Sequence, residues 1–199
     1  MDIGPLLAYV EGSRLADAIR NSLYLFPLIE SFHVVGLALV FGTIAIIDLR
    51  LLGVASARRP FTLLASDTLK WTWWAFGLTV ITGALMFITN AAVYFDNTYF
   101  RAKVVLLVLA ALNAVVFELT ARRTVAGWDQ APSAPPLARA VASLSLVIWI
   151  GVIVAGRMIG FTATRAAATA PAPVDTSFED LLGLPAAGDP AQPAGKSPE

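Results

Sequence analysis

The chain has 199 residues, of which 57% are hydrophobic and 14% are charged, with zero formal net charge, one histidine and no cysteine. A soluble domain carries about 25% charged residues, so this chain lacks the polar surface to cover itself in water and is predicted to lie in a membrane. The balanced charge excludes the basic field that nucleic-acid binding needs. The missing cysteines exclude disulfides, thiolate metal sites and cysteine nucleophiles.

The N-terminal segment, residues 1–22, begins MDIGPLLAYVEGSR and lacks the basic start and small-residue cleavage site of a signal peptide. Apolar residues recur through PLLAYVEGSRLADAIRNS, but the segment is too short and too polar to cross a bilayer. We expect it to form an amphipathic helix that lies in the membrane interface.

Residues 23–164 contain four apolar stretches of about 20 residues or more, the length that a helix needs to span a bilayer. The predicted spans are about 23–47, 71–92, 103–121 and 140–164. Several glycines fall within these spans, and small residues let membrane helices approach each other closely. The predicted fold is therefore all-α, a polytopic membrane four-helix bundle whose first partner is the lipid bilayer.

The C-terminal segment, residues 165–199, is dominated by Ala, Pro and Gly, a composition that cannot build a core. It is predicted to be a disordered tail, with docking of its piece SFEDLLGL on a partner as the alternative. The loops after the first and third spans hold the larger share of basic residues. This favours a bacterial inner-membrane protein with both termini in the periplasm, and Trp71, Trp73 and Trp74 at the cytoplasmic interface.

Each span carries a polar residue at a similar depth. At a rise of about 1.5 Å per residue, four residues lie about 25–30 Å from the basic residue at the cytoplasmic end of their own span. They are His33, Asn90, Lys103 and Arg157. Glu30 shares a helix face with His33 because the two are three residues apart. Intramembrane ionisable residues are usually paired and often functional. A structural ion pair between Glu30 and Arg157, and snorkelling of Lys103 to water, are the alternatives to a functional site.

The cytoplasmic ends of the spans carry a second polar group, predicted to be structural together with Asn90. Asp48 and Arg50 close the first span, and Glu118 lies one turn before Arg122 on the third. We expect Asp48 to pair with a loop arginine. A bundle-facing line from Glu30 through His33 to Asp48 is the alternative.

Three stretches, HVVGLALVFGTIAIIDLRLLG, FRAKVVLLVLAALN and AGRMIGFT, together resemble an uncharacterised bacterial family of four-helix integral membrane proteins, a domain of unknown function. The resemblance covers about residues 25–164. It implies that the family's marked positions are Glu30, His33, Asp48, Arg50, Lys103 and Arg157. More distantly, the layout is similar to copper-resistance D-type membrane proteins and haem-linked membrane protoporphyrinogen oxidases, which implies haem or copper near a membrane histidine.

The first hypothesis for function is a haem b protein that takes part in electron transfer near the outer face. His33 is the candidate axial metal ligand, and Glu30 would accept a hydrogen bond from its other nitrogen, as carboxylates beside metal-bound histidines commonly do. Arg157 and Lys103 would neutralise the haem propionates. Met86 lies near the depth of His33 and is the candidate second ligand.

Two other hypotheses stay open. One is a non-catalytic anchor or assembly subunit of a larger membrane complex. The other is a small transporter of copper, protons or an anion, in which His33 and Glu30 relay protons and Arg157 binds the anion. A homo-oligomer or a membrane complex is expected in either case. No hydrolase triad, phosphate loop or nucleotide fold is recognisable, so enzymatic activity is left open.

Overall fold

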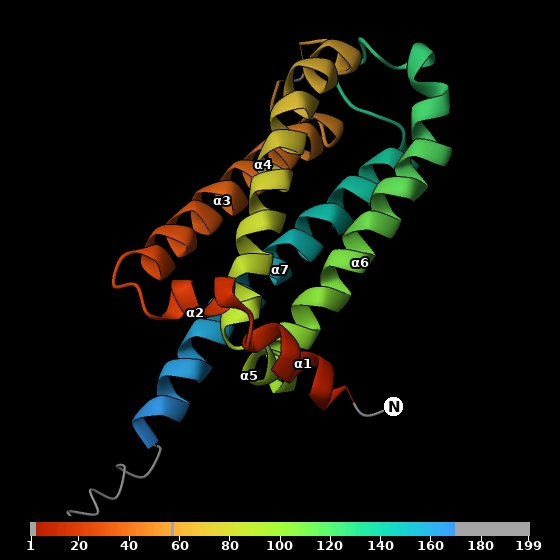
Figure 1. Cartoon of the computed structure of the whole chain (residues 1–199). Coiled ribbons are helices and arrows are strands. Elements are labelled where there is room, and N and C mark those ends of the chain that lie inside the picture. The colour runs from red at the N-terminus through yellow and green to blue at the C-terminus, as the bar shows by residue number, and fades with distance from the viewer. Residues whose placement is uncertain (1–2, 57, 170–199) are drawn as a thin grey trace, which may run out of the picture. The chain divides into compact units, whose positions relative to one another are not determined.

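The computed structural model describes residues 3–56 and 58–169, and within these ranges the regular elements are all helices (Figure 1). In chain order they are α1 (Gly4–Glu11), α2 (Arg14–Arg20), α3 (Leu25–Leu51), α4 (Phe61–Thr89), α5 (Ala91–Asp96), α6 (Thr98–Leu119), the 3₁₀ helix η1 (Ala121–Gly127) and α7 (Pro136–Thr169). The predicted all-α fold is confirmed. Residues 163–199 belong to a unit separate from residues 1–162, and most of the predicted disordered tail lies outside the described residues.

Four of these helices, α3, α4, α6 and α7, are long and apolar enough to cross a membrane. They run side by side in Figure 1, and the chain is an integral membrane protein. The main difference from the predicted spans is in α4, which begins at Phe61 rather than near residue 71. We name the two ends of the four helices after residues that lie near them, the His33 end and the Arg50 end.

The helix ends follow from local sequence. Asn97 caps α6, because its side chain accepts hydrogen bonds from the backbone N–H groups of Tyr99 at 2.9 Å and Phe100 at 3.3 Å. Leu52 ends α3, and Gly53 then turns the chain at a positive φ of 77°, which glycine adopts without steric cost. Pro60 precedes α4, where the side chain of Asp129 accepts from both the N–H and the hydroxyl of Thr62.

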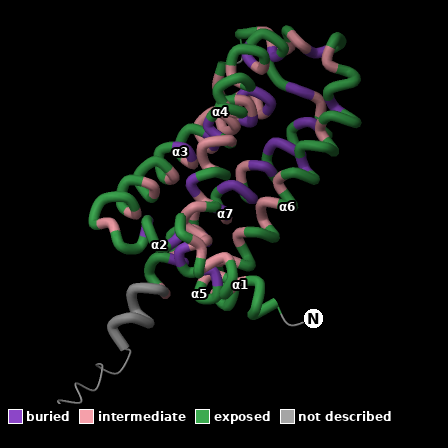
Figure 2. The backbone as a smooth tube through the Cα atoms, in the orientation of Figure 1, coloured by how far each residue is buried: buried purple, intermediate pink, exposed green. Residues whose placement is uncertain are grey.

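Helices α3 and α4 pack against each other along their length, and two features allow the close approach. A Cβ atom added at Gly36 of α3 would lie 2.6 Å from the Thr79 hydroxyl oxygen of α4, so any larger residue would force one of the two to move. Further along, the Thr72 hydroxyl donates to the Thr43 hydroxyl at 2.9 Å. Figure 2 shows the buried positions mostly on the sides of the helices that face one another. A central core includes Val40, Ala75, Trp149 and Val152.

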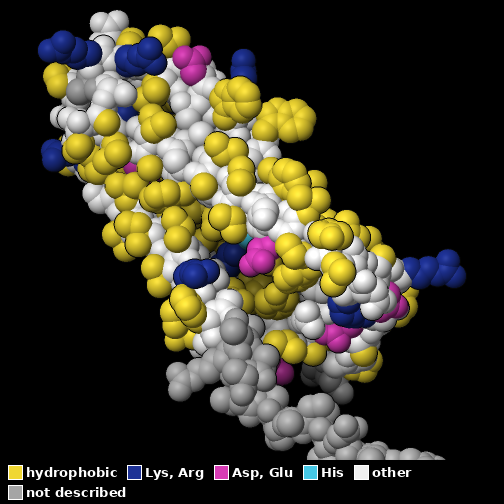
Figure 3. Space-filling model, turned by 90° about the vertical axis from the view of Figure 1, so that its left-hand side faces the viewer, with side chains coloured by type: hydrophobic (Ala, Val, Ile, Leu, Met, Phe, Trp, Pro, Cys, Tyr) yellow, Lys and Arg dark blue, Asp and Glu magenta, His cyan; other side chains and the backbone are white. Residues whose placement is uncertain are grey.

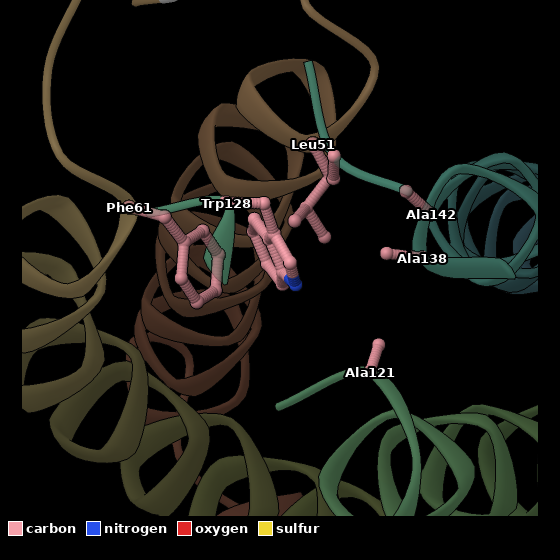
Figure 4. Packing of buried hydrophobic residues seen from close by; sticks show 7 residues of the cluster. Leu51, Phe61, Ala121, Trp128, Ala138 and Ala142 are labelled. Carbon is pink, nitrogen blue, oxygen red and sulfur yellow. The ribbon is translucent and has the colours of Figure 1, made fainter. Parts of the chain in front are cut away.

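A second core closes the Arg50 end. Phe61 and Trp128 pack with ring centroids 5.2 Å apart, and Leu51 lies beside them (Figure 4). Arg50 is fully buried under this core and donates to three backbone carbonyls, those of Arg59 at 2.8 Å, Asp129 at 3.1 Å and Ala131 at 3.0 Å. Arg50 therefore joins the α3–α4 loop to the segment that follows η1.

The N-terminal segment forms two short helices rather than the single helix expected. Ser13 separates them and caps α2, because its hydroxyl accepts from the Ala16 N–H at 3.3 Å. These helices hold the point where α4 gives way to α5. The Arg20 guanidinium donates to the Thr89 carbonyl at 2.8 Å, and the Glu11 carboxylate accepts from the Ala92 N–H at 2.8 Å. Each contact satisfies a backbone group that a helix end leaves free.

Candidate functional site

His33 lies on α3 with its imidazole turned into the bundle against α4. Its Nδ1 atom is 3.0 Å from the Thr79 carbonyl oxygen and 3.1 Å from the Thr82 hydroxyl oxygen. Gly83 makes room for the ring, because an added Cβ there would lie 3.0 Å from Cε1 and 3.4 Å from Nδ1 of His33. The ring is therefore positioned by three residues of one helix, α4.

These contacts define which ring nitrogen carries the proton. A carbonyl oxygen can only accept, so Nδ1 must donate to Thr79. The Thr82 hydroxyl donates its own hydrogen to the Leu78 carbonyl at 2.7 Å, which leaves its oxygen free to accept from Nδ1 as well. In the neutral imidazole the lone pair then resides on Nε2, the atom that can take a proton or bind a metal.

That Nε2 atom faces Lys103 of α6. The Lys103 Nζ lies 3.4 Å from Nε2, about 7 Å along α6 from its first residue. Gly156 of α7 borders the ammonium group, since a Cβ there would lie 3.6 Å from Nζ. In the part of the chain that the structure describes, no carboxylate lies within ion-pair distance of Lys103. A half-buried cation without an acidic partner therefore points at the free lone pair of the only histidine.

The distance between the two nitrogens limits how much charge the pair can hold. Two positive charges 3.4 Å apart repel each other by about 5 kcal/mol at an effective dielectric constant of about 20. With the lysine charged and the histidine neutral, the ammonium donates to Nε2 and the repulsion is absent. A second proton becomes favourable when a negative charge binds beside the pair.

Glu30 and Arg157 lie near this pair but do not join it. The predicted ion pair between them is absent from the described residues, where salt bridges link Arg20 to Asp17 and Arg122 to Glu118. The Arg157 guanidinium instead lies over the Phe161 ring, 4.6 Å from its centroid. The space-filling view shows basic and acidic side chains beside the histidine in a hollow of the apolar surface (Figure 3).

Tyr94 of α5 lies at the same end of the molecule, in a cluster of aromatic rings with Phe87 and Phe100. Burial raises the pKa of the Tyr94 phenol, and the negative charge of Glu30 raises it further. The charge of the Glu30 carboxylate therefore affects the ionisation of Tyr94. Among the described residues, the imidazole donates no hydrogen bond to this carboxylate. The predicted role of Glu30 as the imidazole's partner is taken by the Thr79 carbonyl.

The other predicted residues lie elsewhere. Asn90 is exposed at the end of α4, about 10 Å beyond Thr82, and does not reach His33. Met86 is half-buried one turn beyond Thr82 on α4, on the face that holds Thr79 and Thr82. Glu118 forms an i,i+4 ion pair with Arg122 at the opposite end.

Asp48 differs from expectation, because it does not pair with a loop arginine in the described part of the chain. It is buried, and the Ser145 hydroxyl of α7 lies close to its carboxyl group. Arg50, two residues further along α3, donates to carbonyls of the two loops.

Sequence reasoning missed the residues that position the imidazole. Thr79, Thr82 and Gly83 follow a spacing of three and four residues, which marks one helix face. That spacing also fits ordinary close packing in membranes, so it could not single out a site without the register between α3 and α4.

Haem does not fit the pair as the structure has it. A metal bound to Nε2 would lie about 2 Å from it, the usual length of a metal–imidazole bond. Lys103 Nζ is only 3.4 Å from the same atom, so an iron with its porphyrin plane requires the lysine to swing away. For a metal ion held by protein ligands alone, the described residues contain no group of three or more suitable His, Cys, Asp and Glu side chains.

Fold and site together define a class: integral membrane proteins with four long apolar helices and a histidine–lysine pair between them. A family model described as a family of unknown function (DUF6644) matches residues 19–162, and the chain belongs to this family. The predicted membership of an uncharacterised family is thereby confirmed. No curated protein and no solved structure matches the chain, so no likeness to copper-resistance or haem-linked proteins is found.

Proposed function

We propose that the chain binds a small anion together with a proton at the His33–Lys103 pair and carries both across the membrane. The observation that supports this most directly is the 3.4 Å contact between Lys103 Nζ and the unprotonated Nε2 of His33, with no carboxylate paired to the lysine in the described residues. The ligand is an inorganic anion or a small carboxylate.

The coupling of the two ligands follows from charge. The pair holds one positive charge when the site binds no anion, because a second would repel the first at close range. A bound anion attracts both cations, which favours the second proton on Nε2. The anion and the proton therefore bind together, and each raises the affinity for the other by the same factor.

The position of the pair suits exchange with one side of the membrane. Thr82 is seven residues, or about 10 Å, from the last residue of α4, and Lys103 is about 7 Å from the first residue of α6. The opposite end is closed by the core around Phe61 and Trp128. These distances support entry of the anion from the His33 end.

Flux in vesicles tests this proposal. Purified protein is reconstituted into liposomes with an entrapped pH dye, and inward gradients of chloride, nitrate, acetate and phosphate are imposed one at a time with the membrane potential clamped. We expect the lumen to acidify with at least one anion, beyond the rate in protein-free liposomes, and the effect to fall at least tenfold in His33→Ala and Lys103→Met.

Arg101→Gln is the matched control, because Arg101 is an exposed cation two residues before Lys103 and contacts only the Asp96 carbonyl among the described groups. This variant should keep the wild-type rate. Absence of coupled acidification with all four anions, or equal rates in His33→Ala and the wild type, would refute the proposal.

Haem b binding by His33, with a role in electron transfer, is the second candidate function. The bond from Nδ1 to the Thr79 carbonyl favours it, because metal-bound histidines are oriented by such a bond at the other nitrogen. It requires Lys103 to leave its present position. The absorption spectrum of the purified protein, oxidised and then reduced with dithionite, decides it: a Soret band that is lost in His33→Ala supports haem, and a colourless protein refutes it.

A further inference from the structure

Asp48 is a second ionisable group on α3 that the His33–Lys103 pair does not use. It lies 15 residues from His33, or about 22 Å along the helix, towards the Arg50 end. Its exposed fraction is 6%. One of its carboxyl oxygens, Oδ2, is buried and has no hydrogen-bond partner, and the Ser145 hydroxyl of α7 lies close to the carboxyl group.

The charged residues nearest in sequence or in space do not neutralise Asp48. Arg50 is two positions further along, and residues two apart do not face each other on a helix. The Arg50 guanidinium is directed to the carbonyls of the two loops. The charged side chains that neighbouring helices carry at this end are exposed. They are Asp67 and Lys70 of α4, Glu118 of α6 and Arg139 of α7. Within the described ranges, none of them forms an ion pair with Asp48.

An ionised carboxylate in this place would be poorly solvated. A buried polar atom without a hydrogen bond costs about 1–3 kcal/mol, and more when it is charged. A protonated carboxyl group is neutral and avoids the larger part of that cost. We infer that Asp48 is a proton-binding site that holds its proton at neutral pH, so that α3 carries one proton site near each end.

The two proton sites are separate in this structure. Hydroxyl groups line part of the α3–α4 contact, namely those of Thr43, Thr72, Thr79 and Thr82. Between Thr72 and Thr79 the contact is filled by the buried apolar side chains of Val40 and Ala75. Proton binding at Asp48 is therefore inferred independently of anion binding at Lys103, and either can fail without the other.

Infrared spectroscopy of the full chain tests the inference. A protonated carboxyl group in an apolar environment gives a carbonyl stretch separated from the carboxylate and amide bands. In an ester-free detergent at neutral pH, we expect such a band in the wild type and its loss in Asp48→Asn. Glu30→Gln and Glu118→Gln, which remove exposed carboxylates, should leave the band unchanged.

Labelling with aspartate that carries ¹³C in the side-chain carboxyl group provides a second measurement that needs no variant, should Asp48→Asn fail to fold. The band should then move to lower frequency in the wild-type chain. Asp17, Asp67 and Asp96 are exposed, and Asp129 accepts two hydrogen bonds from Thr62, so Asp48 is the described aspartate suited to hold a proton. Absence of the band at neutral pH, or a band that aspartate labelling does not move, would overturn the inference.

Discussion

At the scale of single residues, the imidazole of His33 owes its chemistry to two neighbours on opposite sides of the ring. The Thr79 carbonyl fixes the proton on Nδ1, and Lys103 faces the lone pair on Nε2. Neither neighbour is close to His33 in sequence. A histidine three residues after a glutamate predicted a polar site, but the partner of the ring came from the packing of α3 on α4.

Glu30 has a different target from the one its spacing predicted, and this gives a testable consequence. Replacing Glu30 by Gln removes the negative charge that adds to burial in raising the Tyr94 pKa. The phenol should therefore lose its proton at a lower pH than in the wild type, by a small amount because burial is the larger cause. The check is the tyrosinate absorbance during alkaline titration, with Tyr94→Phe subtracted to isolate this tyrosine from the other three. A curve that Glu30→Gln leaves unchanged would contradict the assignment.

Arg157 has a side-chain direction that its position in the sequence did not predict. Its depth in the fourth span was predicted from the sequence, and Gly156 does border Lys103. Which side of α7 its side chain takes depends on rotamer choice, and the contact with Phe161 four residues later competes with any acid on another helix.

At the scale of elements, the α3–α4 contact positions the site through glycines. A methyl group at Gly83 would meet the His33 ring at 3.0 Å, whereas one at Gly77 of the same helix meets nothing within 4 Å. Gly83→Ala should displace the imidazole from Thr79 and reduce coupled flux severalfold at unchanged expression. Gly77→Ala, the matched control, should keep the flux. Equal flux in the two variants would show that the ring position is unimportant.

Gly36 tests the same contact through stability. An alanine there would place its Cβ 2.6 Å from the Thr79 hydroxyl oxygen, and overpacking of this kind costs about 1–3 kcal/mol. Gly42 on the same helix has open space around it, and Gly→Ala in a helix is neutral to stabilising by up to about 1 kcal/mol. Thermal unfolding in detergent should show a lower Tm for Gly36→Ala and an equal or higher Tm for Gly42→Ala. The reverse order would contradict the packing.

The element boundaries were predictable where composition changes sharply and less so elsewhere. The four apolar helices follow from runs of about 20 apolar residues. The first ten residues of α4 were missed because Phe61–Lys70 mixes polar and apolar residues, and its helix is stabilised by Asp129 from a distant segment. The N-terminal segment was expected to be one helix, but Ser13 caps a second one.

At the scale of the whole molecule, Arg50 joins two loops that are about 70 residues apart in sequence. Its guanidinium binds carbonyls of the α3–α4 loop and of the segment before α7. Arg50→Gln should release both loops, because a glutamine cannot reach three carbonyls. Trypsin should then cut faster after Arg59 and Arg123, at least severalfold. Arg58→Gln, which changes an exposed arginine of the same loop, is the control. Equal cleavage rates would mean that Arg50 does not hold the loops.

At the Arg50 end the four helices are closed by the core around Phe61 and Trp128, and the His33–Lys103 pair lies towards the other end. The sequence predicted the two polar levels from residue counts along single helices. The contact between Lys103 and His33 required the register of three helices, which no count along one helix provides. The same holds for Asp48, which forms no ion pair with an arginine among the described residues.

The proton on His33 is the most direct test of the central claim, and the single histidine makes it measurable without variants. Protein labelled with ¹⁵N-histidine and purified without a histidine tag gives one pair of imidazole signals in a nitrogen NMR spectrum. At neutral pH without added anion we predict the neutral tautomer with the proton on Nδ1. Adding the anion that drives flux should convert it to the doubly protonated imidazolium. A proton on Nε2 instead of Nδ1, or no conversion with any of chloride, nitrate, acetate and phosphate, would contradict proton-coupled anion binding at this pair.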